Sequence, residues 1–262
     1  MSISPRMRRR SSNNNNRRHC EERSDEAIQK TAGKDWIASS QGLLAMTEKN
    51  KTEETPMIEF FFDCSSPWTY LAFHNVQPLA KEFGVEISWR PILVGGIFNT
   101  INPSVYASRE TPVPAKARYM KKDLGDWARS AGLAIKMPPS VFPVNSVKAM
   151  RGCIWLQREQ PDKMVPFART VFEIYWGEDQ DISKDEVLTD VCKRSGVDPA
   201  ALFAGIAEQG IKDQLKLNTD EVMARGGYGS PTIYLDKTDM YFGNDRLPLI
   251  REALQRRKAS AA

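Results

Sequence analysis

The chain has 262 residues, 41% of them hydrophobic, and a formal net charge of +4, so it can bury the core of one sizeable domain. No apolar run approaches the roughly 18 residues of a membrane span, which argues against an integral membrane protein. Residues 1–56 hold 11 of the 37 basic and 8 of the 33 acidic residues, which leaves a nearly even 26 and 25 in the remainder. Because the basic excess lies in this first segment, the charge does not favour nucleic-acid binding.

The first segment, residues 1–56, is predicted to be a disordered extension. It contains the low-complexity run Asn13 to Asn16 and no sustained apolar periodicity. It has no secretory apolar region, and acidic residues stand in its middle, where a transit peptide would have few. We favour an over-extended reading frame that precedes a start at Met57, with a native flexible extension as the alternative.

The first predicted element is a buried strand from Ile58 to Phe62, which leads directly into a helix from about Pro67 to Phe83. The apolar residues suit a strand that is covered on both faces. Proline suits the first helical position, where a missing N–H needs no partner, and Ser66 is then the natural N-cap. Such a helix start favours an anion such as a thiolate, a carboxylate or a phosphate. An ordinary capped helix without a ligand is the alternative.

The rest of the chain combines two short strand regions with a long helical middle. Gly84 is predicted to end the first helix, Val85–Ile92 to form a second strand and Asn99–Pro114 to form a loop. A β-hairpin from Thr232 to Phe242 and a last helix from Pro248 to Lys258 follow the helical middle. The middle helices are predicted over residues 116–131, 146–160, 164–176, 184–195, 199–208 and 211–225.

A glycine-rich loop, Gly226-Gly227-Tyr228-Gly229, leads into Ser230-Pro231-Thr232, and Phe242-Gly243-Asn244-Asp245-Arg246-Leu247 precedes the last helix. At the Ser-Pro step a cis proline can turn the chain and leave the preceding backbone free to bind a ligand. Together with Ser66-Pro67-Trp68-Thr69 at the first helix start, these motifs resemble those of the 2-hydroxychromene-2-carboxylate isomerases and kappa-class glutathione transferases. The resemblance covers about residues 57 to 255.

This resemblance implies an α/β fold, namely a thioredoxin-like domain with an all-helical insertion between its βαβ and ββα halves. We therefore predict that residues 57–104 and 226–262 form the thioredoxin-like domain and that residues 105–225 form the helical insertion domain. The insertion is expected to form one wall of the active-site cleft, because pockets favour domain interfaces.

The four cysteines, Cys20, Cys64, Cys153 and Cys192, form neither a C-x-x-C pair nor a zinc-binding pattern. Reduced cysteines in the cytoplasm fit this spacing best. Thiol-disulfide enzymes of the superfamily have Cys-x-x-Cys where this chain has Ser66-Pro67-Trp68-Thr69, and a hydroxyl can form no disulfide. Dithiol redox chemistry is therefore excluded at this helix start. With only two histidines in the chain, we expect neither a histidine triad nor a metal site.

The resemblance implies that Ser66 is the catalytic hydroxyl, which donates a hydrogen bond to the thiolate of bound glutathione and does not itself attack the substrate. Helix termini and nearby cations lower the pKa of a thiol, which makes the thiolate abundant at neutral pH. Cys64 is a competing candidate, but it precedes the helix and is expected to pack at the end of the strand.

Glutathione brings two carboxylates, an ammonium group and a peptide backbone, so its site needs an acid, a base and an exposed edge of main chain. The resemblance implies that Asp245 meets the ammonium group, that the backbone of Ser230 pairs with the cysteinyl peptide, and that Lys116 lies near the glycyl carboxylate or the substrate acid. A solvated Lys116 and an Asp245 that merely caps the last helix are the alternatives. The full set implied for the cofactor is Asn102, Lys116, Ser230, Pro231, Asn244 and Asp245.

Within the resemblance, the activity is a glutathione-dependent cis-trans isomerisation in an aromatic catabolic pathway. It converts 2-hydroxychromene-2-carboxylate-type substrates to trans-o-hydroxybenzylidenepyruvate by reversible thiolate addition. A kappa-class glutathione transferase or peroxidase that acts on another electrophile is one alternative, and a non-catalytic thioredoxin-like binding module is another. We expect a cytoplasmic homodimer that takes a small aromatic substrate and binds neither nucleic acid nor membranes. Flat apolar walls for that substrate are expected from Trp68, Phe98, Tyr119 and Trp127.

Overall fold

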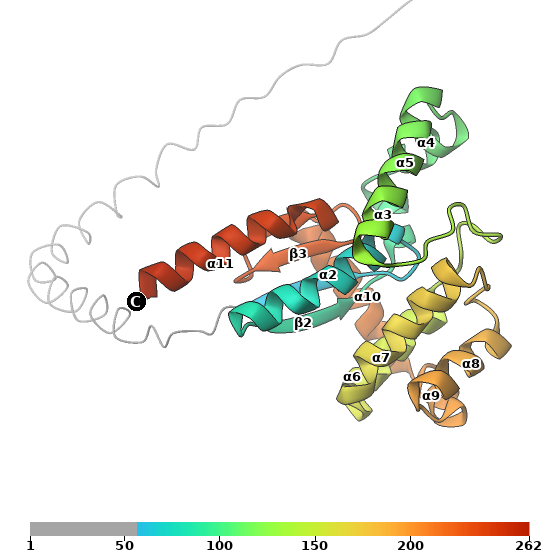
Figure 1. Ribbon diagram of the computed structural model, residues 1–262. Coiled ribbons are helices and arrows are strands. Elements are labelled where there is room, and N and C mark those ends of the chain that lie inside the picture. The colour runs from blue at the N-terminus through green and yellow to red at the C-terminus, as the bar shows by residue number, and fades with distance from the viewer. Residues whose placement is uncertain (1–56, 262) are drawn as a thin grey trace, which may run out of the picture. The chain divides into compact units, whose positions relative to one another are not determined.

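The computed structural model describes residues 57–261, so the extension predicted over residues 1–56 lies outside the described part (Figure 1). A four-stranded sheet in the order β2-β1-β3-β4 lies at its centre. Strand β1 (Met57–Phe62) pairs in parallel with β2 (Glu86–Pro91) and antiparallel with β3 (Thr232–Leu235). Strand β4 (Asp239–Phe242) adds to β3 as a hairpin. The two halves of the predicted α/β fold therefore meet where β1 pairs with β3.

Helices connect and cover the strands. Helix α2 (Pro67–Phe83) links β1 to β2, and α11 (Leu247–Ala261) contacts α2 and follows it along the sheet (Figure 1). Within residues 57–261, no helix is long and apolar enough to cross a membrane. The helices between β2 and β3 are α3 (Val94–Thr100), α4 (Ser104–Glu110), α5 (Pro114–Ala131), α6 (Val147–Glu159), α7 (Pro161–Phe172), α8 (Asp185–Ser195), α9 (Pro199–Gly205) and α10 (Gln209–Ala224).

Strand β1 is covered on both faces, as its sequence predicts. Phe60 and Phe62 belong to the main core, in which Phe73 of α2 contacts both rings. Phe61 belongs to a second, smaller cluster with Val222 of α10. Because successive side chains of a strand point to opposite faces, these two clusters lie on the two sides of the sheet. The rigid strand so formed ends immediately before the Ser66 turn.

Several predicted elements are wrong in part. Val94–Thr100 form α3, where no helix is predicted and residues 99 and 100 are assigned to a loop. Residues 104–110 form α4 where the sequence predicts a loop, and α4 buries none of its residues, so no apolar period marks it. The helix predicted over residues 164–176 begins earlier, at Pro161, because proline suits the first helical position. Its last turn is the π-helix η1 (Glu173–Gly177). The four described strands all lie in residues assigned to the thioredoxin-like domain, while a separate insertion domain over residues 105–225 stays a prediction.

Candidate active site

Ser66 lies at the N-terminus of α2, where the sequence predicts the helix cap. Its backbone is extended, with φ −109° and ψ 125°, and Pro67 is the first helical residue. The Ser66 side-chain oxygen accepts a hydrogen bond from the backbone N–H of Thr69 at 3.3 Å. The predicted cap is therefore confirmed, and the half-buried hydroxyl stands at the positive end of the helix dipole.

The loop that carries Ser230 and Pro231 lies against this helix start. The Ser66 hydroxyl donates to the carbonyl oxygen of Ser230 at 3.1 Å, and the peptide bond from Ser230 to Pro231 is cis. The Ser230 hydroxyl accepts from the backbone N–H of Asp63 at 2.9 Å and shares a hydrogen bond of 2.7 Å with the Thr69 hydroxyl. The structure thus brings together three residues that the resemblance implies for one site, although they are more than 160 positions apart in the chain.

Asp63 is a buried carboxylate at the end of β1 that the sequence patterns do not single out. One carboxylate oxygen accepts from the N–H of Ser65 at 2.9 Å, and the other accepts from the N–H of Val94 at 2.8 Å. Burial raises the pKa of Asp63, and these bonds, together with one from the Ser146 side chain, oppose the rise. The carboxylate therefore ties the Ser66 turn to the starts of α3 and α6. An acidic residue directly after a buried strand is the feature of the sequence that could have found it.

The cysteine thiols of the described chain are buried and are not exposed at this helix start. Every cysteine within residues 57–261 is free and buried. Burial raises the pKa of the Cys64 and Cys153 thiols above their ordinary range. The indole N–H of Trp176 donates to the carbonyl oxygen of Cys64 at 2.9 Å, so Cys64 packs beneath the turn. A protein thiolate at this position is therefore disfavoured.

Aromatic rings surround the guanidinium of Arg109 on α4. The guanidinium carbon lies 5.0 Å from the ring centroid of Phe142, 5.7 Å from that of Phe98 and 6.0 Å from that of Tyr106. The ring centroids of Phe142 and Trp176 are 6.3 Å apart. Phe98 is one of the walls predicted from the sequence, whereas Arg109 and Phe142 were not predicted. The Arg109 guanidinium and the Phe142 ring come together only in the folded chain. Tyr119, also named as a wall, is 64% exposed.

Two of the residues implied for the cofactor follow β2: Asn102 lies in the turn between α3 and α4, and Lys116 lies on α5. Asn102 donates through its side-chain amide to the carbonyl oxygen of Tyr228 at 3.1 Å, two residues before Ser230. Lys116 is exposed in the first turn of α5 and makes no hydrogen bond or ion pair with another of residues 57–261. The structure therefore brings Asn102 to the loop of Ser230 but does not bring Lys116 to any other residue of the set.

Asn244 and Asp245 lie in the 3-10 helix η2 (Asn244–Arg246), directly before α11. The Asn244 side-chain oxygen accepts from the amide of Asn75 on α2 at 2.9 Å, and its own amide nitrogen is buried without a partner in the described residues. Asp245 is exposed and pairs with Arg246 at 2.5 Å. The bond between Asn244 and Asn75 therefore holds η2 against α2, some two helical turns beyond Ser66.

These groups fit glutathione in chemical type. The Ser66 hydroxyl and the start of α2 suit a thiolate. The Ser230 carbonyl oxygen has a second lone pair with which to accept a peptide N–H. The buried amide of Asn244 is a donor that calls for an acceptor, which a carboxylate can supply. The exposed charges of Asp245 and Lys116 are of the signs that the ammonium and carboxylate groups need.

Comparison with known proteins gives a consistent picture. The family model of the DSBA-like thioredoxin domain matches residues 57–255. The 2-hydroxychromene-2-carboxylate isomerase of Pseudomonas putida is 26% identical over 200 residues, which cover 76% of this chain and 95% of that protein. Glutathione S-transferase kappa 1 of Rattus norvegicus is 26% identical over 204 residues, which cover 74% of this chain and 88% of that protein.

Solved structures agree on the fold. The structure of a 2-hydroxychromene-2-carboxylate isomerase has a TM-score of 0.65 at 23% identity and covers 79% of this chain and 99% of its own. The cytosolic disulfide reductase DsbM from Pseudomonas aeruginosa, solved with GSH, has a TM-score of 0.53 at 14% identity and covers 76% of this chain and 99% of its own. The α/β thioredoxin-like fold and the family resemblance drawn from the motifs are confirmed.

Proposed function

Because the chain belongs to the family of DSBA-like thioredoxin domains, we propose that it is a glutathione-dependent isomerase that acts on 2-hydroxychromene-2-carboxylate-type substrates. The observation that supports this most is the Ser66 hydroxyl, which lies at the start of α2 and 3.1 Å from the carbonyl oxygen of Ser230. A hydroxyl at this place can stabilise a thiolate that a cofactor brings, whereas it cannot form a disulfide. The burial of every described cysteine is consistent with a thiol supplied from outside the chain.

When bound, glutathione supplies a thiolate that adds reversibly to the conjugated double bond of the substrate, so that the bond can rotate. The Ser66 hydroxyl has one hydrogen, so on binding it would turn from the Ser230 carbonyl oxygen to donate to the sulfur, and the dipole of α2 would favour the negative charge there. The carbonyl oxygen of Ser230 holds the cysteinyl peptide, while Asn102, Lys116, Asn244 and Asp245 hold the charged ends. Asp63 keeps the turn that presents Ser66 in place through its bonds to Ser65 and Val94.

We expect the substrate to bind at the aromatic rings around Arg109. Phe98 and Phe142 offer flat apolar surfaces for an aromatic ring. The Arg109 guanidinium makes no ion pair with a carboxylate of residues 57–261, so its charge is available to a substrate carboxylate. An aromatic carboxylate is the substrate class of the relatives whose name is 2-hydroxychromene-2-carboxylate isomerase.

A kappa-class glutathione transferase is the second candidate. It rests on the relatives of that name, which match with the same 26% identity as the isomerases. Both activities use the same thiolate-stabilising helix start, so they differ only in the electrophile that reaches the sulfur.

A paired assay tests the proposal. The full chain is given hydroxychromene carboxylate or chlorodinitrobenzene, each with and without glutathione. We expect glutathione-dependent isomerisation of the first substrate to exceed conjugation of the second. Fast conjugation without isomerisation would favour the transferase, and activity without glutathione would contradict both. The cytoplasmic location and the homodimer implied by the resemblance stay predictions, the second of which light scattering tests.

A further inference from the structure

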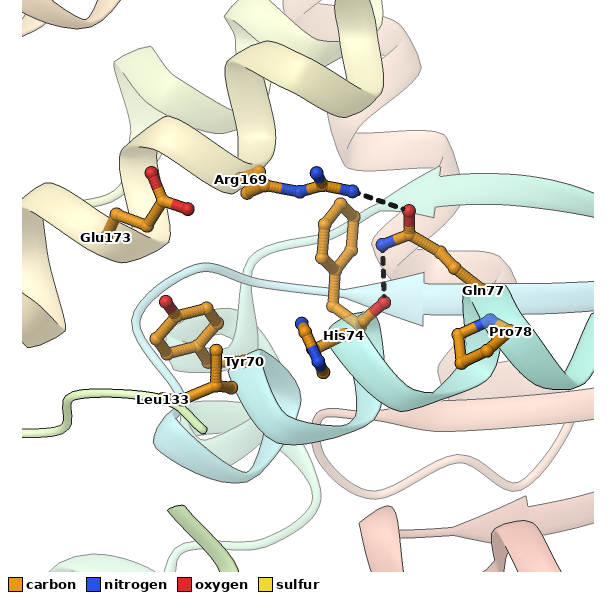
Figure 2. A pocket seen from close by; sticks show the side chains of 8 residues that line it. Tyr70, His74, Gln77, Pro78, Leu133, Arg169 and Glu173 are labelled. Carbon is orange, nitrogen blue, oxygen red and sulfur yellow. Dashed lines mark hydrogen bonds between the residues drawn. The ribbon is translucent and has the colours of Figure 1, made fainter. Parts of the chain in front are cut away.

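A cavity of about 330 Å³ lies between α2 and α7 and includes none of the residues implied for the glutathione site (Figure 2). Its volume is within the range of small-molecule sites in proteins. It begins one helical turn after Ser66 and follows a different stretch of α2. Its lining consists of Tyr70, Phe73, His74, Gln77, Pro78, Leu133, Arg169 and Glu173.

The floor of the cavity is aromatic and fixed. Phe73 is 1% exposed and Tyr70 is 3% exposed, so both rings belong to the core and show only an edge or face to the cavity. The Tyr70 ring stacks on Phe172 of α7, with 5.0 Å between centroids and 5° between planes. Leu133 and Pro78 add apolar walls. Because the two rings are almost completely covered, Leu133 and Pro78 provide the apolar surface that a ligand can reach.

The rim holds polar groups whose bonding is incomplete. The Tyr70 hydroxyl makes no hydrogen bond with any of residues 57–261, and burial raises the pKa of Tyr70 to about 12, so the hydroxyl stays a donor at neutral pH. Arg169 donates to the side-chain oxygen of Gln77 at 2.9 Å, and the Gln77 amide donates to the carbonyl oxygen of Phe73 at 2.7 Å. These hydrogen bonds direct the guanidinium of Arg169 toward Gln77 of α2, as Figure 2 shows.

Two opposite charges border the cavity without neutralising each other. Arg169 and Glu173 are four residues apart, but Glu173 begins the π-helix η1 and the two side chains form no ion pair. Neither pairs with any other charged residue of the described chain. Figure 2 shows Arg169 of α7 reaching toward Gln77 of α2, with Glu173 of η1 on the side of Tyr70. π-Helical segments of this kind occur frequently at functional sites.

We propose that this cavity is a second binding site, for a small amphoteric molecule with the head group of an α-amino acid and an apolar side chain. Its carboxylate binds Arg169, its ammonium group binds Glu173, and its apolar side chain lies against Leu133 and Pro78. A ligand with only a negative charge would face the Glu173 carboxylate, and a ligand with only a positive charge would face Arg169. The amphoteric head satisfies both charges at once.

Calorimetric titration of the full chain with L-phenylalanine tests the proposal. We expect saturable binding that is at least about tenfold tighter than the binding of 3-phenylpropionate, which lacks the ammonium group, or phenethylamine, which lacks the carboxylate. Arg169→Gln and Glu173→Gln should each weaken binding about tenfold or more, because each removes one charged contact. Lys81→Gln and Glu186→Gln are the matched controls, since they remove exposed charges elsewhere and should leave the affinity unchanged.

Ser66→Ala should also bind L-phenylalanine like the unaltered chain, because the cavity is separate from the thiolate site. The variants at Arg169 and Glu173 alter exposed side chains, and unchanged melting temperatures would show that they fold normally. Absence of saturable binding to the unaltered chain would overturn the proposal. Equal binding of the three probes, or full affinity in both the Arg169 and Glu173 variants, would overturn it as well.

Discussion

Cys64 is the residue that separates a mechanism based on a protein thiol from one based on a hydroxyl. Its side chain is fully buried, and burial raises the pKa of its thiol. We therefore expect Cys64→Ala to keep the isomerisation rate within a factor of about three of the unaltered chain. Steady-state kinetics measures this, and a melting curve separates lost activity from lost folding. A folded but inactive Cys64→Ala variant would show that a protein thiol is needed.

At the scale of single residues, the sequence predicts what depends on neighbours in the chain. Ser66 could be found because a serine before a proline at a strand-to-helix junction is a local cap signal. The roles of Asp63 and Arg109 could not be found in this way. The Asp63 carboxylate meets Val94, 31 positions away, and the Arg109 guanidinium meets a ring of Phe142, so both environments exist only after folding.

The turn between β1 and α2 depends on Asp63, and its stability should depend on pH. Burial raises the pKa of Asp63 above its ordinary value of 3.8, so the folded state holds the proton more tightly than the unfolded chain does. The resulting contribution to stability is complete below pH 3.8 and is lost as the pH rises through the folded-state pKa. Asp63→Ala removes this contribution and leaves two backbone N–H groups without their acceptor.

We expect Asp63→Ala to lower the free energy of unfolding by about 1 to 3 kcal/mol for each N–H group left unpaired. The difference from the unaltered chain should be larger at about pH 4 than at about pH 8. Urea denaturation across this range measures it. A difference that grows as the pH rises would show that folding lowers the pKa of Asp63 instead of raising it.

The packing of α9 on α6 depends on a glycine. A side chain at Gly205 would overlap the indole ring of Trp155, which is only 6% exposed. We expect Gly205→Ala to destabilise the fold by about 1 to 3 kcal/mol, the usual cost of overpacking a core. Gly125 of α5 is the matched control, because nothing lies within 4 Å of its added Cβ. Gly125→Ala should stabilise the fold by about 0.5 to 1 kcal/mol. Urea denaturation measures both variants. If both changed the free energy of unfolding in the same direction, the contact with Trp155 would not be what restricts Gly205.

At the scale of elements, periodicity predicts the longer helices that bury an apolar face and misses α3 and α4, each of seven residues. α2 and α8 end at glycines in the left-handed conformation, Gly84 with φ 65° and Gly196 with φ 69°, and both ends could be predicted from the sequence. α4 buries no residue and could not. The π-helix η1 was also missed, because its five residues change the hydrogen-bond spacing without changing the apolar pattern.

At the scale of the whole chain, residues 57–261 contain the described core, and the family match begins at Met57. We expect a shortened chain that starts at Met57 to keep the melting temperature and the isomerisation rate of the full chain, because residues 1–56 show no core-forming pattern. Differential scanning calorimetry and the paired assay measure the two properties. A large loss of either would show that the first segment contributes to the fold or to the site.

The central claim is that Ser66 stabilises the thiolate of bound glutathione. The most direct measurement is the pKa of that thiol, followed by thiolate absorbance during a pH titration of glutathione on the unaltered chain, on Ser66→Ala and on Ser65→Ala. Ser65 is the matched control because it precedes the cap residue and its hydrogen bonds go to Asp63. We predict a raised thiol pKa and a rate about 10- to 1000-fold lower in Ser66→Ala alone, with glutathione affinity retained. An unchanged thiol pKa and rate in Ser66→Ala would contradict the claim.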